Sequence, residues 1–343
     1  MANGVTALEK TLIGVELLAG STTDVVTTHW RGTGKIKDRQ ERVYPPERVG
    51  RVGGTTRSYV ARTGGEIPLE TEALSFEQLP YILNAGIYST TPTTDTGSGY
   101  VWTWNVQSAS TDAYATTDLA TLVIESGDNN DVEIARYCFV REFTVSGKQG
   151  EALTLSSVLQ SRAPSTSSSF TAVGSTDLEN PCEAIIFSKC ALYVDDSTGT
   201  AGSTALTETI LDMTLKHTTG WVELPARDSR LDFSSIKHID DEIMLDVTFE
   251  HNTNAASEKA KYRAGTERVI RLQFAGSTLT SGGTYTTKLY RMDLYGSWMT
   301  FGNEGLEEQD GDNILKATFR CAYSPGADKK ATYIVVNEVQ TLP

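Results

Sequence analysis

The chain has 343 residues, enough for about two domains that each bury a core of their own. Its formal net charge of −14 argues against a surface built to grip nucleic acid or anionic lipid, although it leaves open a channel through which nucleic acid slides without binding. Abundant Thr, Ser and Gly, with many β-branched residues, predict a mainly β protein with many turns.

The four cysteines, Cys138, Cys182, Cys190 and Cys321, form no C-x-x-C pair, so we expect reduced structural thiols rather than a zinc site. No apolar run approaches the roughly 20 residues that span a bilayer. The first residues lack the basic start and apolar core of a signal peptide. We therefore expect a protein that is made and assembled in the cytoplasm and does not bind membranes.

After two predicted strands, Thr11–Ala19 and Asp24–Trp30, the chain enters a long polar segment, Arg31–Arg57. Besides Arg31 it holds seven basic residues: Lys35, Lys37, Arg39, Arg42, Arg48, Arg51 and Arg57. A loop of this length inside a compact domain is usually functional or disordered. It is either a solvated loop or an arm that docks on an acidic surface of another subunit.

A strand that runs into a short helix follows, within Gly65–Gly86. Alternation of Glu66, Pro68, Glu70 and Glu72 with Ile67 and Leu69 predicts a half-buried strand. Ser75 and Gln78 are spaced as a capping box, and Gly86 stops the helix. Pro80 lies past the first turn of such a helix and should kink or shorten it.

The remaining strands of the first half are predicted at Tyr100–Val106, Ala120–Ser126, Val132–Ser146 and Glu151–Arg162. The Ser/Thr/Pro-rich segment Ser161–Pro181 is typical of a linker. We therefore expect a first domain at 1–163, a linker at 164–181 and a second domain at 182–343.

The second half repeats this order. Strands at Ala184–Val194 and Leu206–His217 precede a polar loop, Thr218–His238, and a second strand–helix unit, Glu242–Gly265. Thr253 follows Ser75 by 178 residues, and Gly265 follows Gly86 by 179. The further predicted strands are Arg268–Phe274, Tyr285–Tyr295, Asn313–Tyr323 and Ala331–Val339, the last without an obvious partner in its own half. The match indicates a diverged internal duplication.

The segment Gly302–Asp312 is strongly acidic. Its carboxylates are Glu304, Glu307, Glu308, Asp310 and Asp312. One half thus carries a basic loop and the other an acidic one, a complementarity that suits repeated subunits stacking on one another.

No arrangement of residues indicates catalysis. The four histidines, His29, His217, His238 and His251, do not form an HExxH motif, and none has a nucleophile nearby in sequence. The aromatic residues mostly fall at alternating strand positions and are expected to pack in sheets. We expect no catalytic residue, no bound metal and no cofactor.

Three stretches carry a family resemblance: EIPLETEALSFEQLPYILNAGI, the hairpin that runs into Phe143–Lys148, and Trp298–Asp312 followed by ILKATFRCAYS. They resemble tail tube (major tail) proteins of long, non-contractile-tailed bacteriophages. The resemblance implies β-sandwich or partly closed β-barrel domains, each with a short flanking α-helix. Rings of six such domains stack into the hollow tail tube that delivers DNA.

With two copies per chain, the protein resembles the tandem-domain variety, in which three chains make a pseudo-sixfold ring. The resemblance makes Arg31–Arg57 the loop that contacts the adjacent ring and Thr218–His238 its counterpart. The implied partners are further copies of the chain, the tape measure protein, the tail terminator and distal tail proteins, and double-stranded DNA in the lumen. The implied location is the tail of the virion.

An acidic wall would repel phosphates and let DNA pass without binding. The residues expected to line the lumen are Glu66, Glu70, Glu72, Glu242, Asp246 and Glu250. Two other classes stay open. A decoration or capsid-associated β-protein needs neither the duplicated unit nor the long loops. A glycan-binding or glycan-cleaving β-domain needs grouped aromatic residues or a carboxylate pair and does not polymerise.

Overall fold

The computed structural model describes residues 8–107, 119–128, 130–173, 182–225, 229–302, 307–309 and 311–342. These residues form a mainly β structure with two α-helices, which confirms the predicted fold class at that level. None of the described helices is long and apolar enough to cross a membrane.

The elements of the first half are β1 (Lys10–Val15), β2 (Thr28–His29), β3 (Thr33–Gly34), β4 (Lys37–Val43), β5 (Tyr59–Thr71), α1 (Leu79–Gly86), β6 (Thr93–Thr94), β7 (Tyr100–Val106), β8 (Leu122–Gly127), β9 (Val132–Lys148), β10 (Thr154–Ser161) and β11 (Ser165–Ser167). Those of the second half are η2 (Phe187–Lys189), β12 (Cys190–Asp196), β13 (Ile210–Thr218), β14 (Trp221–Leu224), β15 (Ser235–His238), β16 (Glu242–Glu250), α3 (Thr253–Arg263), β17 (Arg268–Thr278), β18 (Thr287–Phe301), β19 (Glu307–Gln309), β20 (Asp312–Cys321) and β21 (Ala331–Asn337).

The two halves share one order of antiparallel strands. In the first half the pairing runs β1–β8–β9–β10–β5–β4. In the second it runs β12–β17–β18–β20–β16–β13. In each half the helix follows the strand in the fifth place, β5 or β16. This recurrence supports the duplication inferred from the sequence. The predicted linker, 164–181, contains β11, which pairs with β9 of the first half, and its last eight residues lie outside the described chain.

A β-bulge matches the halves residue by residue. In the pairing of β9 with β10 the register shifts at Arg141, which has no partner in β10. In the pairing of β18 with β20 it shifts at Met299, which has no partner in β20. A bulge is a local feature that bends a strand at a defined position, so it serves as a marker. Matching the bulges makes Arg141 equivalent to Met299 and Phe143 equivalent to Phe301.

The match extends to the neighbouring strands. Leu159 and Phe319 are the partners opposite the residue just before each bulge. Leu159 pairs onward with Ile67 of β5, and Phe319 pairs onward with Leu245 of β16. Ile67 and Leu245 are therefore equivalent, and they lie 178 residues apart, the same separation as Ser75 and Thr253.

The first helix differs from its prediction. The Ser75 hydroxyl does accept a hydrogen bond from the N–H of Gln78 at 3.2 Å. Residues 76–78 form a turn, however, and α1 begins at Leu79. Pro80 therefore lies in the first turn, where its missing N–H costs nothing, and the expected shortening of the helix is confirmed. All eight residues of α1 are buried, so it is an internal helix rather than a flanking one.

The second helix lies within the strand–helix unit predicted at Glu242–Gly265. Asn252 caps α3 by accepting a hydrogen bond from the N–H of Ala255 at 3.0 Å. Gly265 follows in the left-handed conformation, with φ of +65°. Only Ala255 and Glu258 of α3 are buried, so this helix covers the sheet from outside.

The two halves share their sheets. β13 of the second half pairs with β9 of the first, and β21 pairs with both β18 and β7. The expectation that the last strand lacks a partner in its own half is therefore wrong. One large core cluster spans both halves and includes Trp104, Phe143, Phe249 and Tyr333.

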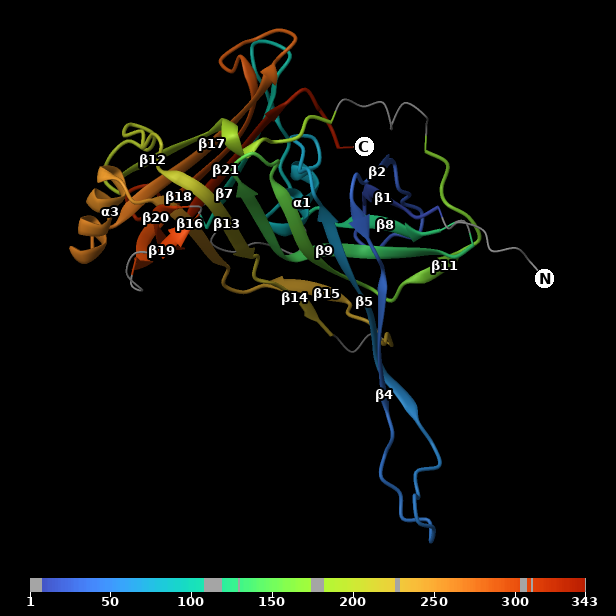
Figure 1. The fold of residues 1–343 in the computed structure, drawn as a ribbon. Coiled ribbons are helices and arrows are strands. Elements are labelled where there is room, and N and C mark those ends of the chain that lie inside the picture. The colour runs from blue at the N-terminus through green and yellow to red at the C-terminus, as the bar shows by residue number, and fades with distance from the viewer. Residues whose placement is uncertain are drawn as a thin grey trace.

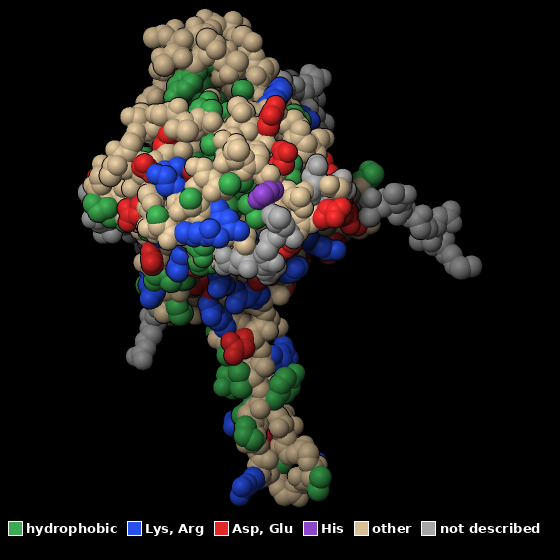
Figure 2. Space-filling model, turned by 60° about the vertical axis from the view of Figure 1, so that its left-hand side comes forward, with side chains coloured by type: hydrophobic (Ala, Val, Ile, Leu, Met, Phe, Trp, Pro, Cys, Tyr) green, Lys and Arg blue, Asp and Glu red, His purple; other side chains and the backbone are tan. Residues whose placement is uncertain are grey.

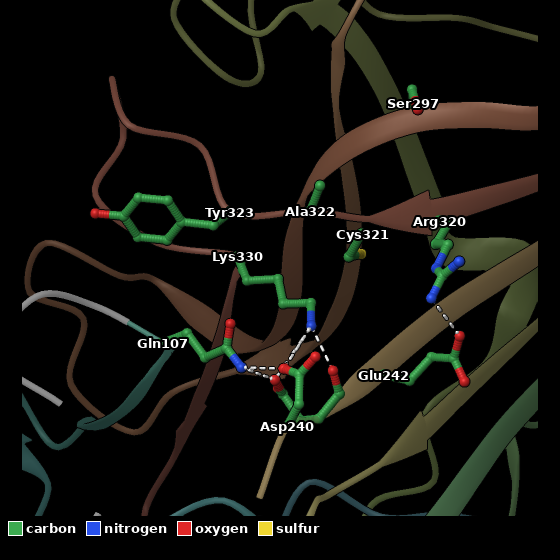
Figure 3. Close-up of a pocket in the computed structure, with 10 residues that line it drawn as sticks. Gln107, Asp240, Glu242, Ser297, Arg320, Cys321, Ala322, Tyr323 and Lys330 are labelled. Carbon is green, nitrogen blue, oxygen red and sulfur yellow. Dashed lines mark hydrogen bonds and ion pairs between the residues drawn. The ribbon is translucent and has the colours of Figure 1, made fainter. Parts of the chain in front are cut away.

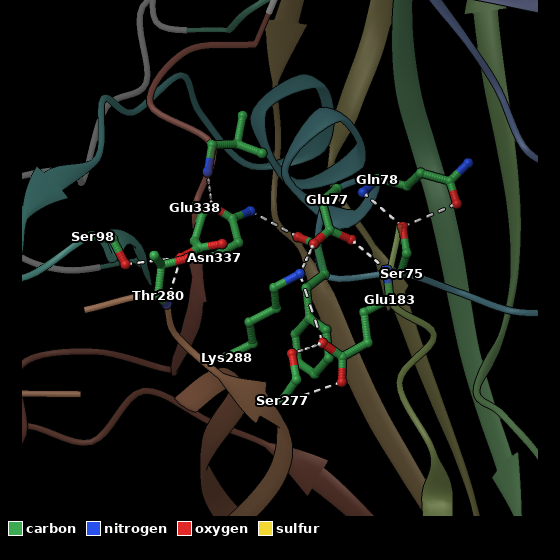
Figure 4. A network of polar contacts seen from close by, with 12 residues as sticks. Ser75, Glu77, Gln78, Ser98, Glu183, Ser277, Thr280, Lys288, Asn337 and Glu338 are labelled. Carbon is green, nitrogen blue, oxygen red and sulfur yellow. Dashed lines mark hydrogen bonds and ion pairs between the residues drawn. The ribbon is translucent and has the colours of Figure 1, made fainter. Parts of the chain in front are cut away.

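A polar network ties the entry of α1 to the second half (Figure 4). Lys288 Nζ lies 2.6 Å from the Glu77 carboxylate and 3.7 Å from that of Glu183. Burial lowers the pKa of Lys288, but the hydrogen bond and charge of Glu77 outweigh it and raise that pKa. Asn337 donates a hydrogen bond to the carbonyl of Phe76 at 2.9 Å. The segment before α1 is thus anchored on β18 and the C-terminal segment.

The segment expected to be a structureless loop, Arg31–Arg57, is largely a hairpin. β4 pairs with the first half of β5, from Lys37 opposite Glu66 to Val43 opposite Tyr59. The hairpin projects far from the body as an arm (Figure 1). We call residues 37–66 the arm. The prediction of a loop failed because β5 begins twelve residues before Thr71. The pairing of this N-terminal part of β5 with β4 is a contact that the local sequence pattern does not reveal.

Candidate subunit interface

The arm is the most exposed part of the described chain. All seven basic residues predicted for this segment are exposed: Lys35, Lys37, Arg39, Arg42, Arg48, Arg51 and Arg57. Exposed apolar side chains lie between them, including Tyr44, Val49 and Val52. Figure 2 shows Lys and Arg side chains gathered where the arm leaves the body. An exposed surface with both apolar and charged groups is typical of a segment that docks on a partner.

The predicted counterpart, Thr218–His238, is not a second arm. Its described residues contain the hairpin β14–β15, which packs on the first half. Trp221 is fully buried in a cluster with Phe233, Ile236, Tyr137 and Phe139. The expectation of two equivalent stacking loops is therefore wrong. Apolar contacts between distant segments hold this loop down, and its polar composition concealed them.

A buried carboxylate also holds β14 to the root of the arm. Glu223 forms ion pairs with Arg39, at 3.3 Å, and with Arg62, while its own side chain is 8% exposed. Arg39 thus has an intramolecular role besides any contact with another copy. The arm leaves the body from a fixed root.

One edge of β4 has no strand partner among the described residues. β4 pairs only with β5, where Gln40 lies opposite Thr63. The N–H of Thr63 bonds instead to the carbonyl of Leu231 at 3.0 Å. In an antiparallel ladder, residues opposite each other alternate between hydrogen-bonded pairs and pairs whose polar groups point away. The backbone groups of Gln40, and of Asp38 two residues earlier, therefore point outward from the sheet.

The C-terminal part of β18 has a second open edge. Ser297–Phe301 pairs with β20 on one side, and no described strand pairs on the other. The N–H of Gly302 bonds to the carbonyl of Lys316 at 2.8 Å, so the alternation turns the backbone groups of Phe301 outward. Met299 at the bulge is 46% exposed. Open, partly apolar edges are sites where another strand adds.

Inside the chain, the equivalents of these two edges pair with each other. β13 pairs with β9 in a regular antiparallel register, His217 opposite Phe143. The N–H of Thr219 then bonds to the carbonyl of Arg141 at 2.9 Å. β13 is equivalent to β4, because each pairs with the equivalent strand, β16 or β5. β9 is equivalent to β18. The described chain therefore contains one complete joint, between β13 and β9. It also contains the equivalents of these two strands, β4 and β18, which do not pair with each other.

The described part of the acidic segment lies along β20, beyond the C-terminal end of β18. Glu307 and Glu308 are in β19, which pairs with the start of β20, and Glu307 lies 2.6 Å from Lys316 Nζ. Asp312 begins β20. Glu304 and Asp310 lie outside the described residues.

Five of the six residues expected to line the lumen come from two strands of one sheet. Glu66 and Glu70 of β5, and Glu242 and Asp246 of β16, occupy positions that alternate with buried residues. Glu250 ends β16 half-buried, and Glu72 is exposed but lies beyond the end of β5.

The same face also carries basic residues, which the sequence pattern did not single out. Lys216 lies 3.6 Å from Glu142, and Arg320 lies 2.9 Å from Glu242. Lys216 and Arg320 both pair across the sheet with Met244. Strand alternation could have placed them on this face, but their cross-strand partners are non-local. The face is therefore mixed in charge rather than uniformly acidic.

A polar cavity of about 570 Å³ opens beside the joint of the two halves (Figure 3). Lys330 Nζ lies 3.2 Å from Asp241, and His217 Nε2 lies 3.4 Å from the same carboxylate. Burial raises the pKa of Asp241, but His217 and Lys330 outweigh it and lower that pKa. The charges at the cavity thus compensate one another. Within the described ranges no group of three or more His, Cys, Asp or Glu side chains is placed to hold a metal ion.

No protein-family model matches the chain, and a search of curated proteins found no match.

Proposed function

We propose that the protein is a structural subunit of a phage tail tube, in which copies join into rings and the rings stack into a hollow tube. The observation that carries the proposal is the intramolecular joint between β13 and β9, together with the equivalent edges of β4 and of the C-terminal part of β18, which have no strand partner among the described residues. In the proposed ring, β4 of one copy pairs with the C-terminal part of β18 of the next.

In this proposal the open edge of β4 on one copy binds the open edge of β18 on the next copy, so the copies associate head to tail. Such a contact closes into a ring when the rotation between neighbours divides a full turn, and otherwise gives an open filament. Each chain has two equivalent units, so three chains present six units around the ring. Closure also pairs the open edges of β4 and of β18, which removes the tendency of these two edges to aggregate.

The arm is the proposed contact between rings. It projects from the body (Figure 1) and exposes apolar and basic side chains, and the described residues of Thr218–His238 do not form a second arm. A ring of three chains therefore extends three arms rather than six. The neighbouring ring is the proposed partner, and the tube assembles on the tape measure protein between the distal tail and terminator proteins.

The solvent-facing side of the shared sheet is the proposed wall of the lumen. Its carboxylates alternate with Lys and Arg, and several are paired within 4 Å of one another. Charges compensated in this way give DNA no continuous basic track to bind, so counterion release does not hold it in the tube.

The test combines microscopy with a register-specific cross-link. Negative-stain electron microscopy of the purified protein at rising concentration should give threefold rings or hollow tubes. Arg39 and Thr300 become opposite neighbours in the proposed joint, so a chain with Arg39→Cys and Thr300→Cys should form disulfide-linked oligomers. The control chain, with Arg39→Cys and Ser297→Cys, should not. Stable monomers at every concentration, with no cross-link, would overturn the proposal, and glycan binding by those monomers would support the alternative class.

A further inference from the structure

We propose that an ion pair between Asp38 of one copy and Lys259 of the next selects the correct joint between copies. This inference rests on the proposed ring. It adds a specific pair of side chains, and the charge of that pair discriminates the joint between copies from the joint within each copy.

The intramolecular joint, in which β13 pairs with β9, is called the inner joint, and its register predicts the position of Asp38 in the joint between copies. Lys37 pairs with Glu66, and Lys216 pairs with Met244, whose positions in β5 and β16 are equivalent. Lys37 is thus equivalent to Lys216, and Asp38 is equivalent to the next residue, His217. Since His217 lies opposite Phe143 in the inner joint, Asp38 is expected opposite the equivalent of Phe143 in the neighbouring copy, which is Phe301.

Side chains of directly opposite residues lie on the same face of a sheet. Phe301 is fully buried beneath α3, where its ring stacks with that of Tyr262 at a centroid distance of 6.4 Å. Asp38 therefore enters the joint on the side that carries α3.

Lys259 of α3 lies close to Phe301, at the end of β18. Its Nζ donates a hydrogen bond to the carbonyl of Gly302 at 3.3 Å, one residue beyond Phe301. The side chain is half-buried, and no carboxylate of the described chain lies within ion-pair distance of it. The open edge of β18 thus has a cation beside it that a carboxylate on the incoming strand would neutralise.

Among the described residues, Asp38 in turn has no cationic partner in its own copy. It is exposed, and no ion pair forms between it and the described Lys or Arg side chains. Burial raises the pKa of nearby Glu133, and the negative charge of Asp38 raises it further. The Asp38 carboxylate thus has a like-charged neighbour in Glu133. Burying it on closure requires a cation from the acceptor, because an uncompensated buried charge is strongly unfavourable.

The inner joint uses different chemistry at the same position. His217 stacks on Tyr333, with centroids 5.8 Å apart, and faces the Asp241 carboxylate at 3.4 Å. An Asp38 that took the place of His217 would meet Asp241 with a like charge. The charges thus favour β4 at the edge of β18 and disfavour β4 at the edge of β9, an arrangement that combines attraction with repulsion of the wrong partner.

The test is charge reversal and its rescue. Asp38→Lys and Lys259→Glu should each lower the association constant between copies about tenfold or more, and the chain with both changes should recover most of it. Glu41→Lys is the matched control. It makes the same change of charge on the same strand, on the opposite face, and should leave assembly within about threefold of the wild type. Sedimentation velocity over a concentration series gives the constants, and thermal melting of each variant at low concentration checks that the monomer folds.

The outcomes separate this inference from the proposed function. A wild-type protein that forms rings, with single reversals that assemble equally well, overturns the ion pair and leaves the ring. The ion pair is overturned in the same way if both single reversals impair assembly and the double change does not restore it. If the wild-type protein never associates and the chain with Arg39→Cys and Thr300→Cys gives no cross-link, the ring itself is overturned.

Discussion

The outward-facing backbone of β4 allows a substitution that separates assembly from folding. Gln40 lies opposite Thr63, whose N–H bonds to Leu231 rather than to β4. Proline at position 40 therefore removes no hydrogen bond between β4 and β5, and edge strands tolerate proline where the N–H faces solvent. In the proposed joint Gln40 is equivalent to Thr219, whose N–H donates to the carbonyl of Arg141. Gln40→Pro removes that bond from every joint between copies.

The magnitude follows from the one bond lost. The acceptor would be the carbonyl of Met299, which is equivalent to that of Arg141, and closure would bury it without a donor. An unsatisfied buried acceptor costs about 1–3 kcal/mol. Since 1.4 kcal/mol is tenfold in an equilibrium constant, each joint should weaken about 5-fold to 150-fold. A closed ring multiplies that factor over its joints.

The assay is sedimentation velocity of wild type and variant over the same range of concentration, with thermal melting of dilute protein alongside. Gln40→Pro should retain the melting temperature of the wild type while its rings form only at much higher concentration. The matched control is Glu41→Pro, because the neighbouring pair in the ladder, Glu41 opposite Arg62, does bond to β5. That variant should lower the melting temperature. Rings of Gln40→Pro at the wild-type concentration, with a folded monomer, would refute the proposed joint.

Three further predictions concern stability and the lumen. Trp221→Ala should lower the free energy of unfolding by about 3–5 kcal/mol in urea titration, because Trp221 is fully buried; a loss below about 1 kcal/mol would contradict the packing of β14–β15. N–H donors, first that of Tyr285, lower the pKa of Asp95 to about 2. Its stabilising effect is present above the ordinary pKa and is lost as the pH falls toward 2, so the melting temperature of Asp95→Asn should decline less than that of the wild type between pH 4.5 and 2; parallel curves would contradict this. Glu70→Lys with Glu72→Lys should leave tubes assembled but slow DNA ejection, and ejection at the normal rate would remove the assignment of this face to the lumen.

Some features of the fold follow from the sequence by itself. The predicted strand–helix unit Glu242–Gly265 contains both β16 and α3, and Gly265 placed the C-terminal end of that helix. These signals are local, since a cap or a pleated face involves residues within one turn or one strand. The repeated strand–helix unit was visible for the same reason.

Other features were misread because their stabilising contacts are non-local. The polar composition of Arg31–Arg57 indicated a loop, yet pairing with the far end of β5 makes it an arm. Thr218–His238 looked like its counterpart, yet Trp221 and Phe233 fix it to aromatic residues of β9. The start of α1 could have been read correctly, since Pro80 is compatible only with the first turn.

The sequence by itself thus determined the β character of the chain, most of its strands and its repeat. Only the tertiary structure decided which strand edges are satisfied within the chain and which remain open. The pairing of β13 with β9 brings together residues about 70 positions apart, and no periodicity in either strand encodes that choice. The equivalent edges of β4 and of the end of β18 have no strand partner among the described residues. The fold, and not the sequence pattern, therefore identifies these two edges as the candidate interface.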